Sequence, residues 1–162
     1  HRFYDSLLTS IQWEQKQVML FGRLINEPRL SAWYGDEGLD YTYSGIVHKP
    51  LSWTPELLEI KAEVEVEAKV VYNSVLLNFY RDGLDSMGWH QDDEKELGLN
   101  PIIGSVSFGA TRKFRFKHAG MKKLNVEIEL ENGSFLLMKG ETQHHWYHCI
   151  PKTRRPVGPR IN

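Results

Sequence analysis

The sequence of 162 residues contains a single cysteine, Cys149. One cysteine excludes an internal disulfide framework and is typical of a protein from a reducing compartment. No apolar run is long enough to cross a membrane as a helix, and the first residues lack the basic and then apolar order of a secretion signal. We therefore expect an intracellular protein with no membrane partner, in the nucleus of a eukaryote or in the cytoplasm and nucleoid of a bacterium.

The chain has almost no net charge, but its charges are unevenly distributed. Residues 1–110 carry 9 basic and 17 acidic side chains, whereas residues 111–162 carry 11 basic and 4 acidic ones. A basic half on a nearly neutral protein is typical of a surface that binds a polyanion such as nucleic acid. A solvated basic face is the alternative.

No internal repeat or low-complexity linker divides the chain. We expect one domain spanning residues 1–162, because this length can bury a core. Residues 3–15 have the spacing of an amphipathic helix. A second helix is predicted within residues 52–69, where Thr54 suits the N-cap and Pro55 suits the first helical position.

The rest of the chain is dominated by short apolar or alternating runs that predict strands. These runs are residues 74–80, 102–109, 112–118, 125–131, 134–139 and 144–150. Between the fourth and fifth runs, Asn132-Gly133 predicts a hairpin. Many short strands separated by turns indicate a sandwich or barrel. The expected fold class is α+β, mainly β, with the helices of the first half packed outside.

The stretch MGWHQDDEKE places His90 two residues before Asp92. In an extended segment, such a pair points to one face and can hold one ion. The later run HHWYHCI offers His144, His145 and His148, and strand alternation puts the first and third on one face. Two histidines and one carboxylate form the facial triad that leaves positions open on Fe(II). A polar loop and a polar edge strand remain alternatives at this point.

Two further pairs have the same spacing, Asn78 with Tyr80 and Arg160 with Asn162. Each pair can direct two polar groups into one cavity. A buried arginine is costly unless a carboxylate pairs with it, and a bidentate contact is the strong form of that pairing. An exposed arginine near the chain end is the alternative for Arg160.

The segments LLNFYRDGLDSMGWHQDDEKELGLNPIIGSVSFGATRKFRFKH, HHWYHCIPK and PRIN resemble the AlkB family of Fe(II)/2-oxoglutarate dioxygenases. The resemblance runs from about residue 18 to the end, and it is greatest for the AlkB homologue 2 type, which repairs alkylated bases in duplex DNA. It implies a double-stranded β-helix, or jelly roll, with a substrate-recognition part over about residues 1–70 and a catalytic core over about residues 71–162. It also implies Fe(II), 2-oxoglutarate and dioxygen (O2) as cofactor and co-substrates.

By this resemblance, the metal ligands are His90, Asp92 and His148. The residues that contact 2-oxoglutarate are Asn78, Tyr80, Arg160 and Asn162. The family's motif continues to a second arginine, but this sequence stops at Asn162. We expect the natural chain to continue, because a protein seldom ends within a strand of its own active site.

The resemblance also implies a substrate side. Tyr41, Tyr43 and Ser44 match a lid in which an aromatic ring stacks on the flipped base. Glu94 matches an acid that contacts the damaged base, and its charge suits the cationic lesions 1-methyladenine and 3-methylcytosine. Phe21 matches a finger that enters the duplex and fills the gap left by the flipped nucleotide.

Phosphate contacts are expected from basic side chains, which position the nucleic acid without reading its sequence. The candidates are Lys152, Arg154 and Arg155, with Arg29, Arg112 and Lys113 as weaker ones. The expected reaction is oxidative demethylation of DNA bases with release of formaldehyde by a monomer. The alternatives are the same chemistry on single-stranded DNA or RNA, an inactive nucleic-acid-binding module, and a zinc hydrolase.

Overall fold

Helices occupy little of the chain, as the sequence predicts. The computed structural model describes residues 2–43 and 46–162. Its helical elements are α1 (Arg2–Ser10), α2 (Pro55–Ala68), the 3-10 helix η1 (Lys95–Leu97) and the short α3 (Thr142–His145). The Thr54 hydroxyl accepts a hydrogen bond from the Leu57 N–H at 3.3 Å, so the predicted N-cap of α2 is confirmed.

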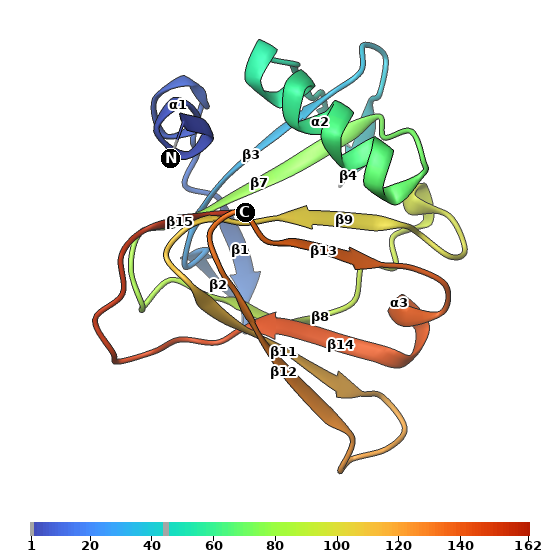
Figure 1. Cartoon of the computed structure of the whole chain (residues 1–162). Coiled ribbons are helices and arrows are strands. Elements are labelled where there is room, and N and C mark those ends of the chain that lie inside the picture. Colours follow the sequence, from blue (N-terminus) through green and yellow to red (C-terminus); the bar gives the residue numbers. More distant parts are fainter. Residues whose placement is uncertain (1, 44–45) are drawn as a thin grey trace.

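A five-stranded sheet forms one wall of the molecule. Its strands are β3 (Leu30–Gly35), β6 (Leu51–Ser52), β7 (Ser74–Tyr80), β10 (Phe108–Gly109) and β15 (Arg160–Ile161). They lie in the order β10-β15-β7-β3-β6. In Figure 1, α1 and α2 lie on the outer side of this sheet, over β3 and β7.

A four-stranded sheet forms the opposite wall. Its strands are β8 (Met87–His90), β11 (Arg112–His118), β12 (Asn125–Leu130) and β14 (Trp146–Ile150), in the order β12-β11-β14-β8. A separate pair joins β9 (Ile103–Val106) to β13 (Phe135–Met138). The chain moves repeatedly from one wall to the other, and this arrangement confirms the expected jelly roll with helices outside (Figure 1).

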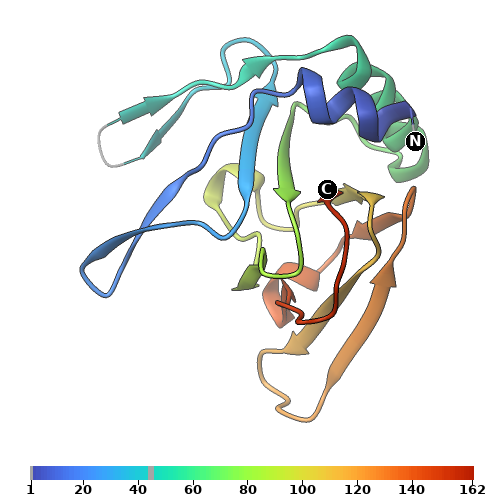
Figure 2. The same cartoon turned by 90° about the vertical axis from the view of Figure 1, so that its left-hand side faces the viewer.

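Two hairpins extend from the same side of the molecule, as Figure 2 shows. One joins β1 (Gln17–Leu20) to β2 (Arg23–Asn26), and the other joins β4 (Tyr41–Tyr43) to β5 (Ile46–His48). At the tip of the first hairpin, Phe21 and Gly22 have φ angles of 49° and 73°. Two consecutive positive φ angles are typical of a type I′ turn.

Alternation along the strands divides the apolar side chains between two cores. Leu77 of β7 joins Leu7 and Leu57 in a cluster between the helices and the five-stranded sheet. Tyr80 of the same strand belongs to a second cluster with Phe114 and residues of the other strands. Since neighbouring side chains of a strand point to opposite faces, β7 presents one row to the helices and another to the interior of the jelly roll.

Two expectations about local structure are wrong. The Asn132-Gly133 turn is present, with Gly133 at φ 79°, but β12 pairs with β11 and β13 pairs with β9, so the turn carries the chain between sheets and makes no hairpin. The predicted strand over residues 144–150 begins only at Trp146, because His144 and His145 belong to α3. Across residues 2–43 and 46–162, no helix has both the length and the apolar character needed to cross a membrane.

Candidate active site

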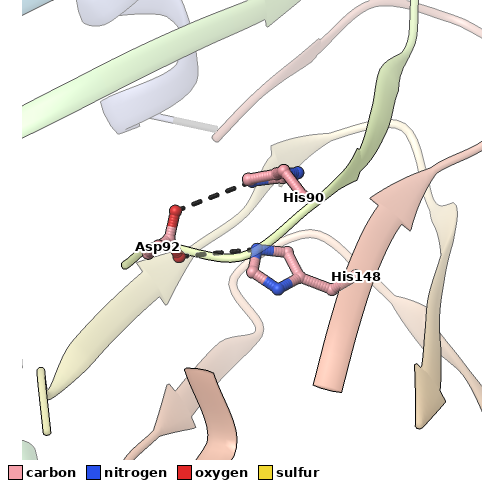
Figure 3. A group of neighbouring side chains, drawn as sticks. All are labelled: His90, Asp92 and His148. Atoms are coloured by element: carbon pink, nitrogen blue, oxygen red, sulfur yellow. Dashed lines mark ion pairs between the residues drawn. The ribbon is translucent and has the colours of Figure 1, made fainter. Parts of the chain in front are cut away.

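The two ends of the predicted metal cluster meet because β8 and β14 are paired. The register places His90 opposite His148, although 57 residues separate them in the chain. Directly opposite side chains share a face of the sheet, and the ring centroids of the two imidazoles lie 4.2 Å apart. Asp92 follows the end of β8 and turns back toward them (Figure 3).

The Asp92 carboxylate bridges the two imidazoles. Its Oδ1 lies 3.6 Å from Nε2 of His90, and its Oδ2 lies 3.4 Å from Nε2 of His148 (Figure 3). The three candidate ligand atoms all lie within 4.8 Å of one another. One divalent ion can therefore be reached by all three side chains, with one carboxylate and two imidazoles as donors.

His90 is held in the form that a metal requires. Its Nδ1 lies 2.9 Å from the carbonyl oxygen of Gly88. When Nδ1 carries the proton and donates it to this carbonyl, Nε2 is left with a free electron pair. Burial lowers the pKa of His90, and the neighbouring His148 lowers it further. The neutral imidazole is thus favoured.

The other two side chains are fixed differently. Burial raises the pKa of the Asp92 carboxyl, but the hydrogen bond and the charge interaction with His148 outweigh it, and the net pKa lies below the usual value. The His148 ring is 3% exposed and stacks on Phe114 at 5.4 Å between ring centroids. Packing therefore holds His148, and its lowered pKa keeps the Asp92 carboxyl ionised at neutral pH.

Arg160 is a charged side chain buried without a carboxylate partner in the described chain. It is 0% exposed, and its Nη2 donates to the Ser107 hydroxyl at 2.9 Å. Within residues 2–43 and 46–162, its Nε and Nη1 have no hydrogen-bond partner. Burial lowers its pKa to about 10, which leaves it charged at neutral pH. The alternative of an exposed terminal arginine is wrong.

Asn78 and Tyr80 face the same interior as Arg160. The register pairs Tyr80 with Arg160, and the guanidinium lies 5.3 Å from the centre of the Tyr80 ring. The Asn78 Oδ1 accepts a hydrogen bond of 2.8 Å from Nε of Arg29. This contact fixes which way the amide is turned, because it leaves the NH2 group of Asn78 to donate elsewhere. Phe114 joins the two regions, since it packs with Tyr80 and stacks on His148.

Asn162 lies opposite Asn78, and its side chain contacts neighbouring strands. Its expected contact with 2-oxoglutarate stays a prediction. Its amide nitrogen donates to the Ser105 hydroxyl and to the Val106 carbonyl, both at 2.8 Å. Its backbone N–H donates to the Asn78 carbonyl at 2.9 Å. Asn162 therefore braces β15 against β7 and β9. Ser107, which holds Arg160, was missed, because no local sequence pattern distinguishes it from other strand serines.

One predicted phosphate contact is wrong. Arg112 is 3% exposed, and it donates to the backbone carbonyls of Asp82, Asp85 and Pro151 at 2.8–3.0 Å. Its donors are used inside the protein, so it cannot reach a nucleic acid. Arg29 is also largely enclosed, and it lies beside Asn78 and 3.2 Å from Glu27.

Other predicted contacts lie at the surface. Phe21 is 96% exposed at the hairpin tip, and Glu94 is exposed immediately before η1. The side chains of Lys152, Arg154 and Arg155 are exposed on the segment between β14 and β15. This segment is anchored by the Thr153 N–H, which donates to the Gly83 carbonyl at 2.8 Å. A Cβ at position 83 would lie 2.5 Å from the Thr153 carbonyl oxygen, so only glycine permits the approach.

The predicted lid lies partly outside the described residues. The backbones of Tyr41 and Tyr43 belong to β4, whereas Ser44 is outside the described ranges and the side chains of the two tyrosines are not described. The roles expected for these three residues stay predictions.

The donor set fits a ferrous ion with an acidic co-substrate. A cluster of two histidines and one aspartate is the set that leaves open positions on Fe(II). An anion beside Nε and Nη1 of Arg160, which have no partner among the described residues, would offset their burial. A carboxylate is the group that a guanidinium binds in a bidentate manner.

Comparison with known proteins agrees with this geometry. The human protein named DNA oxidative demethylase ALKBH2 is 40% identical over 153 residues, which cover 90% of this chain and 59% of that protein. The mouse protein named alpha-ketoglutarate-dependent dioxygenase alkB homolog 3 is 40% identical over 167 residues, which cover 98% of this chain and 58% of that protein. The chain thus spans a little over half the length of these curated relatives.

A solved structure has the same fold. The structure of OsALKBH1 superposes with a TM-score of 0.63 at 14% identity, covering 99% of this chain and 86% of that one. The sequence model of the 2OG-Fe(II) oxygenase superfamily matches residues 1–162. A match over every residue shows that the chain belongs to the 2OG-Fe(II) oxygenase superfamily.

Proposed function

We propose that this chain oxidatively demethylates N-alkylated bases in DNA, with 1-methyladenine and 3-methylcytosine in duplexes as the preferred substrates. The observation that carries the proposal is the cluster of His90, Asp92 and His148 in the same interior as Arg160, whose Nε and Nη1 have no partner among the described residues. The similarity to a relative named a DNA oxidative demethylase supports nucleobases as the substrate class.

The superfamily implies Fe(II), 2-oxoglutarate and dioxygen. When bound, these groups supply the oxidising power that breaks a methyl C–H bond. His90, Asp92 and His148 would hold the metal from one side, which leaves its other side open. Arg160 would pair with a carboxylate of 2-oxoglutarate. The NH2 group of Asn78, turned by Arg29, would donate a second hydrogen bond.

A base within a duplex cannot reach this interior, so the nucleotide must leave the stack. Unstacking costs a few kcal/mol, and an inserted apolar side chain offsets part of this cost. The exposure of Phe21 at a hairpin tip supports this role. The hairpin extends on the same side as β4, which carries Tyr41 and Tyr43 of the proposed lid (Figure 2).

Charge supports a cationic base bound within a polyanion. Glu94 is exposed after the metal ligand Asp92, and its carboxylate would favour the positive charge of a methylated adenine or cytosine over the neutral undamaged base. Lys152, Arg154 and Arg155 would contact phosphates. Such contacts should weaken as the salt concentration rises.

The deciding experiment uses oligonucleotides that carry 1-methyladenine or 3-methylcytosine, as duplexes and as single strands. With Fe(II) and 2-oxoglutarate, the protein should release formaldehyde and restore the base, and Asp92→Ala should do neither. Binding of the oligonucleotides without succinate formation would instead identify an inactive nucleic-acid-binding module.

The duplex preference is tested at the finger. Phe21→Ala should reduce repair of duplexes far more than repair of single strands, because only the duplex needs a wedge. Met19→Ala is the matched control, since Met19 is another exposed apolar side chain, 67% accessible, on the same hairpin but away from its tip. Equal losses on both substrates would exclude the wedge role of Phe21.

A further inference from the structure

Gln143 is a buried polar side chain close to the metal cluster. It is 2% exposed, although Glu141, His144 and His145 around it are exposed. Its Oε1 accepts a hydrogen bond of 2.9 Å from the backbone N–H of Asp92. Its Nε2 lies 3.7 Å from the Met138 sulfur. Both ends of this amide thus have defined contacts, as expected for a buried polar side chain, because an unpaired one would cost stability.

The backbone of Asp92 needs such a support. Asp92 lies beyond His90, the last residue of β8, and belongs to no strand, so no sheet ladder fixes its peptide group. Gln143 lies on α3, which ends at His145 and leads directly into β14, the strand of His148. One hydrogen bond therefore ties the segment of the acidic ligand to the segment of the second histidine.

We propose that Gln143 is a positioning residue for the metal site. By fixing the peptide of Asp92, it directs the carboxylate toward both imidazoles before any ion binds. Without this bond, the loop after β8 must be ordered by the metal itself, and the ordering lowers the affinity. Loss of outer contacts of this kind typically reduces metal affinity 10- to 100-fold. The inference rests on the proposed metal site and adds to it a residue that binds neither metal nor substrate.

The test measures metal binding and backbone protection, both without turnover. Cobalt(II) titration by calorimetry gives the affinity of the full chain. Hydrogen exchange of the Asp92 amide in the metal-free protein reports the bond directly. Gln143→Met removes the acceptor at similar length, and Gln143→Asn keeps an amide that is one methylene too short. Gln143→Glu keeps an acceptor oxygen in either ionisation state. Met138→Leu is the matched control, because it removes the other contact of Gln143 and leaves the Asp92 bond.

We expect Gln143→Met and Gln143→Asn to bind cobalt(II) about 10- to 100-fold more weakly, with faster exchange at Asp92 and unchanged exchange in β8 and β14. Gln143→Glu and Met138→Leu should stay close to the wild type in both measurements. Wild-type affinity or unchanged Asp92 exchange in the first two variants would overturn the inference. Failure of the wild type to bind cobalt(II) would contradict the proposed function instead, and the exchange comparison would still decide whether Gln143 holds Asp92.

Discussion

Replacing Arg160 by methionine should stabilise the ligand-free protein while abolishing binding of 2-oxoglutarate. The guanidinium is fully buried and keeps two nitrogens without partners in the described chain. Methionine retains the apolar stem and removes the charge. A residue placed for a ligand is expected to cost stability when that ligand is absent.

The magnitude follows from the pKa of Arg160. Burial lowers this pKa from the usual value of an arginine to about 10. One pKa unit corresponds to about 1.36 kcal/mol, so the buried charge costs about 3 kcal/mol. At neutral pH the group is protonated in both the folded and the unfolded chain, and the full cost is therefore present. The cost disappears only as the pH rises above about 10 toward the usual pKa of an arginine. Because the variant also leaves Ser107 without its donor, we expect a net gain of about 1–3 kcal/mol.

Urea unfolding measures both halves of this prediction. With Mn²⁺ present, 2-oxoglutarate at 100 times its dissociation constant should stabilise the wild type by about 2.7 kcal/mol, and Arg160→Met should show no such effect. Arg112→Met is the matched control, because Arg112 is equally buried but donates to three carbonyls. It should destabilise the protein by several kcal/mol, since it leaves those carbonyls unpaired. A destabilised Arg160→Met that still responds to 2-oxoglutarate would refute the reasoning.

Three other outcomes are expected. Phe21→Asn should preserve or raise the free energy of unfolding, because asparagine tolerates the φ of 49°. Repair of duplex substrates should fall at the same time. A lower free energy of unfolding in urea would contradict the expected stability. Asp92→Ala should abolish cobalt(II) binding in calorimetry without unfolding the protein by circular dichroism. Asp85→Asn should cost about 1.5–3 kcal/mol at pH 7, because the buried carboxylate accepts charged hydrogen bonds from Arg81. Burial raises the pKa of Asp85, but the hydrogen bonds from Arg81 outweigh this effect, and the net pKa lies below the usual value. The stabilisation is therefore present above about pH 4 and is lost as the pH falls further. Urea unfolding of the wild type and the variant at pH 7 and below about pH 4 measures the difference.

The metal cluster could be predicted because its signals are local or come from an alternating strand. His90 and Asp92 are two residues apart, and His148 lies in a run that reads as a strand. The pairing of β8 with β14, which brings them together, is a long-range property. The resemblance to a family, and not the spacing, selected His148 over the two histidines that begin the same run.

Other features depend on contacts that no local pattern contains. Arg112 reads as a surface cation in an alternating strand, but three carbonyls from two loops converge on it. The hairpin expected at Asn132-Gly133 fails because the following strand finds its partner in β9. Gln143 lies just before the run 144–150 that alternation predicts as a strand, and its bond to Asp92 joins residues 51 positions apart.

Strand β7 divides two tasks between adjacent side chains. Leu77 supports the helical layer, while Asn78 on the other face is held by Arg29 and is proposed to contact 2-oxoglutarate. Substitutions at Leu77 can therefore change the free energy of unfolding without altering the side chains on the opposite face, provided that the alternation is kept. One residue inserted upstream within β7 would reverse the faces of its side chains, so that Asn78 would point to the helices and Leu77 to the interior of the jelly roll. The face to which each side chain of β7 points therefore depends on the number of residues that precede it in the strand.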